Sequence, residues 1–416
     1  MSGKPKMVFV INWFYPDYAS TGQLLTELCL HLQHDFDITV IAAQTGYAGE
    51  ENKEKKRIIH DRLENIRIIR IKLPKVDKKN KLSRLRFIAT YFFYAVVQLL
   101  KQRNTDFIYT ISQPPILGGL IGTIGKFLKG AKHIYNIQDF NPEQAEAVGF
   151  MKNKSVLHIA RWLDTLNCKY ADHIITVGQD MQQTLLRRFA NRKVTENSII
   201  NNWTNEEEII PLAKNHPRVA GFVESCRLEE RFVVMYSGNL GLYYDLENLI
   251  RIAEELRALE DLAFVFIGEG AVKKQMQEYA AEHELLNVHF LPYQPKEDLV
   301  YSLNAADVHL VVNQKGIKGV SVPSKIYGVM AAGKPVMGVL EKGSEAYRLI
   351  EESGCGIIAE PQDYEDIAAK IKELYLADEG RLAQYGSSGR TYLESHLRRD
   401  LSLEKYRQLL LSLNSL

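Results

Sequence analysis

Residues 308–339 read VHLVVNQKGIKGVSVPSKIYGVMAAGKPVMGV, and this stretch decides the fold. It begins with a short apolar run, passes through a polar loop into a segment of helical period, and ends in a second apolar run. Ser324 is placed to cap the start of the helix, and Gly333 is placed to end it. A strand, a helix and a strand in this order predict two parallel strands joined by a right-handed crossover.

The same alternation extends in both directions along the chain. Short runs rich in Val and Ile predict two series of buried strands, separated by a polar and irregular linker at 206–217. The first series is Met7–Asn12, Ile38–Ala42, Ile66–Ile71, Phe107–Thr110, His133–Ile137 and His173–Val177. The second series is Phe232–Ser237, Ala263–Ile267, Val288–Leu291, Val308–Val312, Pro335–Val339 and Gly356–Ala359. The expected helices include Gln23–His34, Ser155–Tyr170, Leu246–Ala258, Ser324–Ala332, Glu379–Tyr385, Arg390–His396 and Asp400–Leu413.

Length and composition agree with two α/β domains, each a doubly wound parallel sheet, at 1–205 and 206–396. The chain has 416 residues, which is too many for one ordinary core and suits two domains of about 200 residues each. Its content of 46% hydrophobic and 25% charged residues is typical of a soluble globular protein. The formal net charge is +1, so we expect no nucleic-acid partner.

The cysteines and the N-terminus indicate the compartment. Cys29, Cys168, Cys226 and Cys355 lie far apart, without a CxxC pair or a His at metal-ligand spacing, so we expect reduced thiols and neither a metal nor another cofactor. The N-terminal apolar run is short and lacks a cleavage site, and no apolar run reaches the ~20 residues that span a bilayer. These features predict a cytoplasmic protein.

The loops that follow the strands are the candidate sites, because ligands of open α/β sheets bind outside the carboxyl ends of the strands. Two sheets with these edges facing each other would share one interdomain cleft. In the first domain, Ser20, Thr21 and Gly22 precede the helix expected from Gln23, and small residues there let backbone N–H groups approach an anion. An ordinary N-cap with a glycine turn is an equal alternative.

Two glycine loops follow strands of the second domain. In the loop 236–241, Gly238 permits a tight turn, and the backbone donors around Gly238 and Asn239 would meet a diphosphate. In the next loop, Gly268 permits close backbone approach, and Glu269 is able to accept hydrogen bonds from a sugar or a base. A simple turn explains the second loop equally well.

Lys325 stands in the first turn of the helix in the opening stretch. The helix dipole disfavours a cation there by about 0.3–1 kcal/mol, and a bound anion would restore the balance. Because Ser324, Lys325 and the dipole point at one place, we favour an anion site over a lysine whose stem lies on the surface.

Asp139 and Glu143 follow a strand of the first domain, so we expect them to face the same cleft. Each is a candidate for a general base or for holding a sugar hydroxyl. The alternative is a pair of loop carboxylates in solvent.

The stretch Lys75–Leu100 suits an anionic membrane surface. It combines basic residues with an apolar run at Phe87–Leu100, and each charge near the headgroups contributes about 1 kcal/mol. The basic residues are Lys75, Lys78, Lys79, Lys81, Arg84 and Arg86. We expect peripheral contact with the inner face of the cytoplasmic membrane, and the alternative is a helix that faces the core.

Several short motifs occur in order along nearly the whole chain. They are Tyr-Pro-x3-Ser-Thr-Gly, Gln-Asp-x2-Pro-Glu, Ala-Asp-His-Ile-Ile-Thr-Val-Gly, Asn-Asn-Trp, Tyr-Ser-Gly-Asn-Leu-Gly, Ile-Gly-Glu-Gly and Pro-Ser-Lys-x2-Gly-x-Met-Ala-Ala-Gly-Lys-Pro. Together they resemble family 4 of the retaining glycosyltransferases, and within it the branch of colanic acid, O-antigen and fucosamine transferases.

The resemblance implies a GT-B fold without a metal, a nucleotide-diphosphate sugar held mainly by the second domain, and an acceptor on the first. It also implies that the last helix, at about 397–416, crosses back to the first domain. The implied catalytic residues are Asp139, Glu143 and Lys325. The implied nucleotide-sugar-binding residues are Gly22, Gly238, Asn239, Gly268, Glu269, Tyr293, Ser324, Lys325 and Tyr327.

The chain departs from the family pattern at several positions. Val320 and Gly328 stand where the family has two Glu residues, the second of which normally binds ribose. Asn239 and Tyr243 or Tyr244 stand where the family commonly has an Arg and a Lys on the diphosphate loop, so Lys325 becomes the expected cation of the site.

The sequence therefore predicts transfer of a sugar from a nucleotide diphosphate to a lipid-linked or polysaccharide acceptor, with retained configuration implied by the resemblance. A sugar-nucleotide epimerase is one alternative, because it can use the same two-domain cleft without an acceptor surface. A non-catalytic sugar-nucleotide binder is the other, because the Glu pair is missing.

Overall fold

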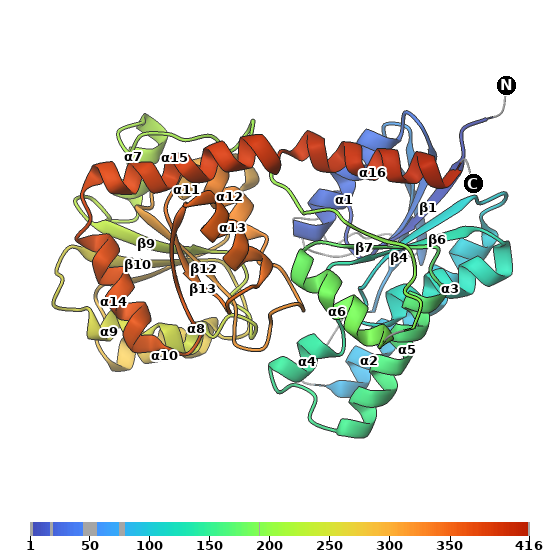
Figure 1. Cartoon of the computed structure of the whole chain (residues 1–416), viewed down its shortest axis with the longest axis horizontal. Helices are drawn as coiled ribbons and strands as arrows, with labels where there is room; N and C mark the ends of the chain where they lie inside the picture. The colour runs from blue at the N-terminus through green and yellow to red at the C-terminus, as the bar shows by residue number, and fades with distance from the viewer. Residues whose placement is uncertain (1–2, 17–19, 45–55, 75–79, 191, 415–416) are drawn as a thin grey trace.

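The computed structural model describes residues 3–16, 20–44, 56–74, 80–190 and 192–414. These residues form two α/β domains side by side, and the last two helices run along the same edge of both (Figure 1). Each domain is a sheet covered by helices on both faces, which is the arrangement expected for strands that are apolar along their whole length.

The first sheet has eight strands within the described ranges, in the order β3-β4-β2-β1-β5-β6-β7-β8. Their bounds are β1 Lys6–Val10, β2 Asp37–Gln44, β3 Ile58–Leu63, β4 Ile66–Lys72, β5 Phe107–Ile111, β6 Lys132–Ile137, β7 His173–Thr176 and β8 Asn197–Ile199. Neighbouring strands are parallel except at the edge, where β3 pairs with β4 antiparallel. The sequence analysis expected only parallel strands and missed β3, whose residues are mostly exposed and carry His60, Asp61 and Arg62 in its middle.

The second sheet has six parallel strands in the described residues, in the order β11-β10-β9-β12-β13-β14. Their bounds are β9 Phe232–Ser237, β10 Leu262–Ile267, β11 Val288–Leu291, β12 Val308–Val312, β13 Val336–Val339 and β14 Gly356–Ala359. The chain starts in the middle of the sheet, winds to one edge and then to the other, so the direction of winding changes between β9 and β12. Loops at such a switch point are where ligands of doubly wound sheets bind.

The helices of the first domain are α1 Ser20–Leu32, α2 Lys81–Lys101, α3 Leu117–Lys129, α4 Glu143–Ala147, α5 Lys154–Tyr170 and α6 Gln179–Phe189. Those of the second are α7 Pro217–Ser225, α8 Leu246–Leu249, α9 Arg251–Glu255, α10 Lys273–Glu282, the 3-10 turn η2 Lys296–Asp298, α11 Leu299–Asn304, α12 Lys325–Ala331, α13 Glu345–Ser353, α14 Tyr364–Tyr375 and α15 Glu379–His396. The last helix is α16 Arg399–Asn414.

Four of the expected helices differ clearly in extent from the helices of the structure. The helix α1 begins at Ser20, so the small residues expected before it form its first turn. The helix expected at Leu246–Ala258 is divided into α8 and α9 at Ile250. The two segments expected at Glu379–Tyr385 and Arg390–His396 form the single helix α15, because no residue between them breaks the helical backbone.

The C-terminal helix α16 packs on the first domain. Leu403, Tyr406 and Leu410 are buried in the same apolar cluster as Met7 and Phe9 of β1. The Tyr406 hydroxyl accepts a hydrogen bond from Asn136 Nδ2 of β6 at 2.7 Å. The chain therefore passes between the domains twice, once before α7 and once after α15 (Figure 1).

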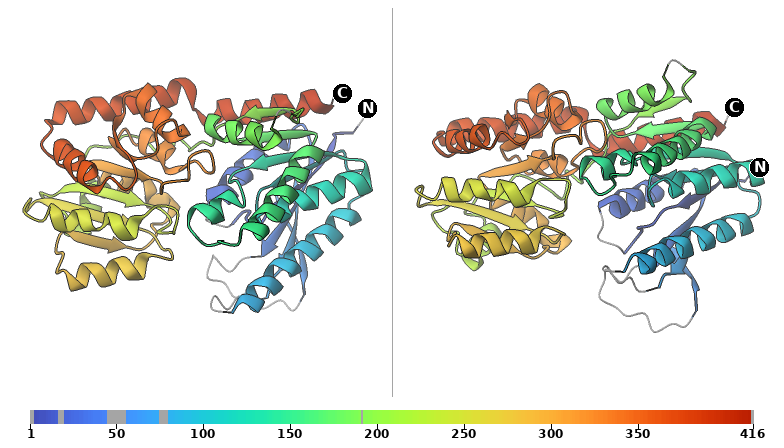
Figure 2. Two further views of the ribbon diagram at one scale, coloured as in Figure 1. Left: turned by 60° about the horizontal axis from the view of Figure 1, so that its bottom comes forward. Right: turned by 90° about the horizontal axis from the view of Figure 1, so that it is seen from below.

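None of the helices in the described residues is both long and apolar enough to cross a bilayer. The longest, α2, lies beside α3, and α3 lies beside α5, on one face of the first sheet (Figure 2).

Candidate active site

Loops at the carboxyl ends of the two sheets meet where the domains join. Asp139, two residues after β6, forms an isolated antiparallel bridge with Ser321 of the second domain. Next to it, the Phe140 N–H donates to the Val320 carbonyl at 2.8 Å. The loops on which the sequence analysis placed the chemistry are therefore in contact with each other.

Lys325 is the central cation of this region. Its Nζ donates to the Tyr236 hydroxyl at 3.0 Å and lies 4.5 Å and 4.1 Å from the ring centroids of Tyr236 and Tyr244. No carboxylate among the described residues forms an ion pair with it. The residue keeps some exposed surface, but the two rings enclose the ammonium end, and this burial lowers the pKa of Lys325 to about 7.

An ammonium group held this way attracts anions. Aromatic faces stabilise a cation by about 0.5–2 kcal/mol, which is less than a carboxylate would contribute in the same enclosed place. Folding therefore makes the neutral amine of Lys325 easier to form than it is in the unfolded chain. A bound diphosphate would have the opposite effect, because its negative charge stabilises the ammonium form.

Gly238 and Gly268 bring the backbone to Lys325. Gly238 has φ +147°, and a Cβ built on it would lie 3.3 Å from Lys325 Cε, so the loop after β9 passes directly over the lysine. Gly268 has φ +138°, and its Cβ would lie 1.9 Å from the Gly238 carbonyl oxygen. Both positions need glycine for their backbone conformation, and the second also needs it for the close approach of the two loops.

The residues next to these glycines line the same two loops. The Asn239 carbonyl accepts from the Tyr236 hydroxyl at 2.8 Å, and its side chain is exposed. Glu269 forms an ion pair with Lys273 at 2.7 Å, and Lys273 Nζ also donates to the Gly268 carbonyl at 2.9 Å. Lys273 is thus a second cation at the loops.

Tyr293 and Tyr327 have different surroundings. The Tyr293 ring would lie 3.3 Å from a Cβ on Gly268, and the side chain is partly exposed beside that loop. Tyr327 is fully buried in the core cluster of the second domain that contains Ile209 and Leu303. Burial raises the pKa of its hydroxyl, and Asn201 of the first domain and Glu345 lie near it, so nucleotide-sugar binding by Tyr327 stays a prediction.

Ser324 does not cap α12 with its side chain. Its backbone is helical, with φ −60° and ψ −17°, whereas a capping residue has an extended backbone, and its side chain makes no capping hydrogen bond. The helix is also short, with seven residues from Lys325 to Ala331. The case for an anion at this place therefore rests on the ammonium group of Lys325 and on the glycine loops, and the helix dipole adds little.

Gly22 lies in the first turn of α1, and no described contact joins it to the Lys325 group. Its carbonyl accepts a hydrogen bond from the Thr26 hydroxyl at 2.7 Å, and a Cβ on it would lie 3.0 Å from Trp13 Cβ. Residues 17–19 of the same predicted loop lie outside the described residues.

Asp139 approaches the Lys325 group from the first domain. Its carboxylate accepts from Gln144 Nε2 at 3.1 Å and from Gln113 Nε2 at 3.4 Å. Burial raises its pKa, while hydrogen bonds from Ser321, Gln113 and Gln144 partly offset the rise. Its charge adds to the effect of burial in raising the pKa of Tyr243 and Tyr244, so the carboxylate lies close to the aromatic side of Lys325.

Glu143 is bound in an ion-pair network. Its carboxylate accepts from Arg161 Nε at 3.0 Å and from both Nε and Nη2 of Arg188. Burial alone would raise the pKa of Glu143, but the charge and hydrogen bonds of Arg188 outweigh burial and lower it. A carboxylate with a lowered pKa and two guanidinium partners is a poor base, so we assign Glu143 no proton transfer.

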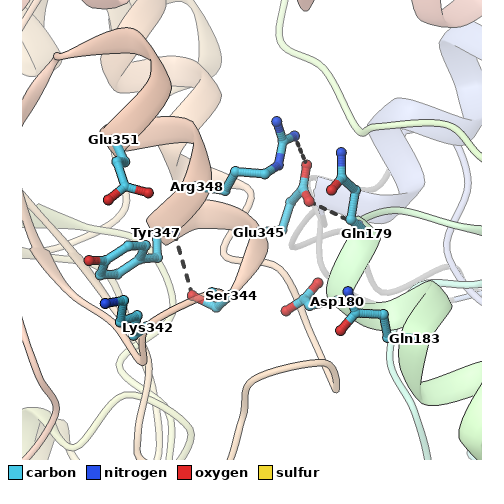
Figure 3. A pocket seen from close by; sticks show the side chains of 10 residues that line it. Gln179, Asp180, Gln183, Lys342, Ser344, Glu345, Tyr347, Arg348 and Glu351 are labelled. Atoms are coloured by element: carbon cyan, nitrogen blue, oxygen red, sulfur yellow. Dashed lines mark hydrogen bonds and ion pairs between the residues drawn. The ribbon is translucent and has the colours of Figure 1, made fainter.

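A separate pocket of about 260 Å³ lies between α6 and the start of α13. Figure 3 shows that Gln179, Asp180 and Gln183 of α6 face Lys342, Tyr347 and Glu351 of the second domain across it. Glu345, whose side chain is fully buried, accepts from the Gln179 N–H at 2.9 Å and so joins the two domains here. None of the expected site residues lines this pocket.

Comparison with known proteins agrees with the architecture. Residues 223–391 match the model of a family described as glycosyl transferases group 1. Sucrose-phosphate synthase from Thermosynechococcus elongatus superposes with a TM-score of 0.77 at 17% identity, covering 99% of both chains. HepE from Anabaena in complex with UDP and glucose superposes with a TM-score of 0.73 at 15% identity, covering 98% of this chain and 100% of that one. The fold is GT-B.

Two curated proteins are similar in sequence. The probable glycosyltransferase WbjE of Pseudomonas aeruginosa is 29% identical over 403 residues, which is 96% of each chain. The putative colanic acid biosynthesis glycosyl transferase WcaI of Escherichia coli strain K12 is 26% identical over 289 residues, which is 67% of each chain. The domain match and these relatives support a GT-B glycosyltransferase.

The sequence analysis missed three residues that contact the expected site residues. Lys273 had a signal, because it lies four residues after Glu269 at the start of α10. Tyr236 belongs to the predicted strand Phe232–Ser237 and to the predicted glycine loop 236–241, but its role as a hydrogen-bond partner of Lys325 depends on the way β9 and α12 come together. Arg188 has no local signal, since its partners are 24 and 45 residues away in the chain.

Proposed function

We propose that this protein transfers a sugar from a nucleotide-diphosphate sugar to a lipid-linked or polysaccharide acceptor in the synthesis of cell-surface glycans. The observation that carries the proposal is the ammonium group of Lys325, enclosed by Tyr236 and Tyr244 beside Gly238 without a carboxylate partner among the described residues. An ammonium group without a carboxylate partner favours the binding of an anion. The leaving group of such a transfer is an anion, a nucleoside diphosphate.

Lys325 would act on the leaving group. Negative charge grows on the diphosphate as the glycosidic bond to it breaks, and a fixed cation and fixed backbone N–H groups stabilise that charge without reorganising. Gly238 and Gly268 would let the backbone approach the phosphates. Glu269, Tyr293 and Asn239 border the same loops and would contact the nucleoside or the sugar. The solved HepE complexes with UDP, and with UDP and glucose, make a UDP-sugar the first donor to test.

Asp139 would act on the sugar or on the acceptor hydroxyl. Its pKa is raised by burial, which brings a carboxylate closer to the range in which it exchanges a proton. In this proposal the first domain, 1–205, carries the acceptor, the second, 206–396, holds the donor, and retention of configuration follows from the family resemblance.

The donor part of the proposal is tested by thermal shift. UDP-, GDP- and dTDP-sugars are added at up to millimolar concentration to the wild type, to Lys325→Ala and to Lys274→Ala, a control lysine on the exposed side of α10. We expect at least one donor to raise the Tm of the wild type and of Lys274→Ala, because a ligand that binds only the native state stabilises it. Absence of any shift in the wild type contradicts the proposal.

The transfer part is tested with the donor that binds. Incubation without an acceptor separates transfer from epimerisation, because only an epimerase would release a free epimeric nucleotide sugar. Failure to transfer to any lipid-linked or saccharide acceptor, with donor binding intact, would favour the non-catalytic binder.

Contact with an anionic membrane surface is also part of the proposal. Residues 75–79 of the predicted stretch lie outside the described residues. The neighbouring helices α2, α3 and α5 of the first domain (Figure 2) carry large apolar side chains that are exposed. They are Leu82, Leu85, Phe93 and Leu100 on α2, Phe127 and Leu128 on α3, and Val156, Ile159, Trp162 and Tyr170 on α5. The sequences of α2 and α3 contain no Asp or Glu, and the only acid of α5, Asp164, is buried.

Vesicle flotation tests this contact. We expect the wild type to float with phosphatidylglycerol vesicles and not with phosphatidylcholine vesicles, since apolar side chains without acids nearby suit an anionic surface. Ile159→Glu together with Trp162→Glu is expected to abolish flotation, while Leu286→Glu, at a 92% exposed position of the second domain, is expected to leave it unchanged. Equal flotation of the two variants would contradict a specific face.

A further inference from the structure

Arg188 is the last residue but one of α6. Among the described cations that form ion pairs in the first domain, it has the least exposed side chain. Its side chain is 4% exposed. It pairs with the carboxylates of Glu143 and Asp164, and the Asp164 side chain is 3% exposed. Tyr135 completes the group, because its hydroxyl donates to Asp164 Oδ1 at 2.8 Å. No step of the proposed transfer uses this group.

The partners of Arg188 lie in the loop that begins at Asp139. Its guanidinium stacks on the Phe140 ring at 4.5 Å, donates to the Asn141 carbonyl at 3.0 Å and binds the Glu143 carboxylate. Three of the four residues after Asp139 are thus held by one side chain from another helix. A planar guanidinium is suited to this, because it donates in several fixed directions at once.

The other end of α6 is fixed to the second domain. Asp180 Oδ2 accepts from the Gly319 N–H at 2.8 Å, and the Gln179 N–H donates to Glu345 Oε2 at 2.9 Å (Figure 3). We call residues 319–321 the bridge segment. It contacts α6 through Gly319 and the Asp139 loop through Val320 and Ser321.

The bridge segment is also anchored by its side chains. Val320 is buried in the apolar cluster of the first domain that contains Tyr135, Phe140 and Met181. A Cβ on Gly319, whose φ is +71°, would lie 2.5 Å from the Thr184 hydroxyl of α6, so this part of the second domain fits closely against the helix. The segment is held between α6 and the Asp139 loop, and Arg188 joins those two elements to each other.

We propose that Arg188 is a positioning residue, which holds the Asp139 loop at the distance from α6 that lets the bridge segment dock and so places Asp139 beside the Lys325 group. This inference rests on the proposed function for its effect on transfer, but its structural part does not. Lys325 Nζ lies 4.1 Å from the ring centroid of Tyr244, and burial and the charge of Asp139 raise the pKa of Tyr244, so the loop carries Asp139 to a residue that encloses the cation.

The experiment compares Arg188→Gln with Arg188→Lys and with Arg161→Gln. Arg161 shares the Glu143 partner but is 37% exposed, which makes it the matched control. We expect Arg188→Gln to lower kcat by about 100-fold, the order of loss known for a reacting group displaced by about 1 Å, with the donor KM changed by less than about threefold. Arg161→Gln is expected to change either constant by less than about threefold.

Arg188→Lys separates positioning from charge. Lysine keeps the positive charge but does not reproduce the planar fork, so it should restore the Tm more than it restores kcat. Full recovery of kcat by lysine would overturn the proposal, because it would reduce the role of Arg188 to charge balance. If Arg188→Gln does not fold, Phe140→Leu, which removes only the stacked ring, should show the same loss of kcat with an unchanged donor KM.

Hydrogen exchange gives a readout that does not depend on turnover. We expect faster amide exchange in residues 138–147 and 319–321 of Arg188→Gln, with residues 232–245 unchanged. Unchanged exchange in 138–147 overturns the inference whatever the assay shows. Lack of turnover by the wild type, together with the expected exchange pattern, would instead contradict the proposed transfer and leave the positioning role supported.

Discussion

The two sides of the domain junction differ in how their charges are balanced. On the second domain, the ammonium group of Lys325 has two tyrosine rings and one hydroxyl as partners and no carboxylate among the described residues. On the first domain, the buried Arg188 is paired with Glu143 and Asp164, and the more exposed Arg161 is paired with Glu143 and Glu146. A balanced network stabilises the fold, whereas an unbalanced charge costs stability and is expected where a ligand completes the pairing.

Lys325→Met is expected to have the largest effect, and it tests whether the charge that lacks a carboxylate partner among the described residues serves a ligand. It should lower kcat by about 10²–10³-fold, the usual loss when one stabilising donor is removed from a developing anion. The same change should raise the free energy of unfolding of the unliganded protein by about 1–2 kcal/mol, because a long apolar side chain replaces a charge enclosed without a counter-charge. Steady-state kinetics and urea unfolding measure the two effects, and a variant that loses stability would show that Lys325 is a structural residue.

Asp139→Asn and Glu143→Gln sharpen the contrast within the first domain. Asp139→Asn should lower kcat by about 100-fold with a small change in Tm, because it removes an ionisable group that the network does not need.

Glu143→Gln should lower the free energy of unfolding by about 2–3 kcal/mol, since it leaves Arg188 with one carboxylate fewer in a buried place. Both variants should still bind the donor, as measured by thermal shift. A large loss of activity in Glu143→Gln at unchanged stability would instead show that Glu143 takes part in catalysis.

The pH dependence of donor binding is the smallest expected effect. The pKa of Lys325 is lowered by burial to about 7 from its ordinary 10.5, so the ammonium loses its proton as the pH rises above 7. A diphosphate binds the protonated form, and the donor Kd should therefore rise with pH, by at most about tenfold per pH unit, between pH 7 and 9. Calorimetry at pH 6.5, 7.5 and 8.5 checks this, and the slope should vanish in Lys325→Met.

The same lysine affects stability with the opposite sign. Between pH 7 and 10.5 the unfolded chain holds the proton of Lys325 and the folded protein does not, so the unliganded protein gains stability as the pH rises through this window. Below pH 7 the full cost of the buried charge is present. Comparison of urea unfolding for the wild type and Lys325→Met across this window isolates the contribution.

The fold was predictable from the sequence where burial is complete. The runs at Phe232–Ser237 and Val308–Val312 are apolar except for Ser237 and His309, and their bounds in β9 and β12 are those expected. Strand β3 was missed because an edge strand with one exposed face lacks such a run. The start of α1 was missed because Ser and Thr residues occur both before a helix and in its first turn.

The site was predictable where its residues lie just after strands or at the start of a helix that follows a strand. Gly238, Gly268 and Lys325 lie on loops that the switch point of the second sheet brings together, and they meet as expected. Ser324 differs from the expected N-cap because the backbone conformation at the start of a short helix depends on the way that helix packs. Asp139 and Glu143 differ in their surroundings because, of the two, Arg188 binds only Glu143. The position of Arg188 relative to these two residues is set by the tertiary fold alone.

The return of α16 to the first domain has a consequence for how the chain is completed during synthesis. Tyr406 fills a space between Tyr109 and Trp203 and binds Asn136, so the core of the first domain contains a side chain that the ribosome adds only after the second domain. The hydrophobic core of the first domain is therefore completed only after the second domain has been synthesised. A nascent chain that stops at 398 would leave an apolar groove open over β1 and β5, with a finished second domain attached.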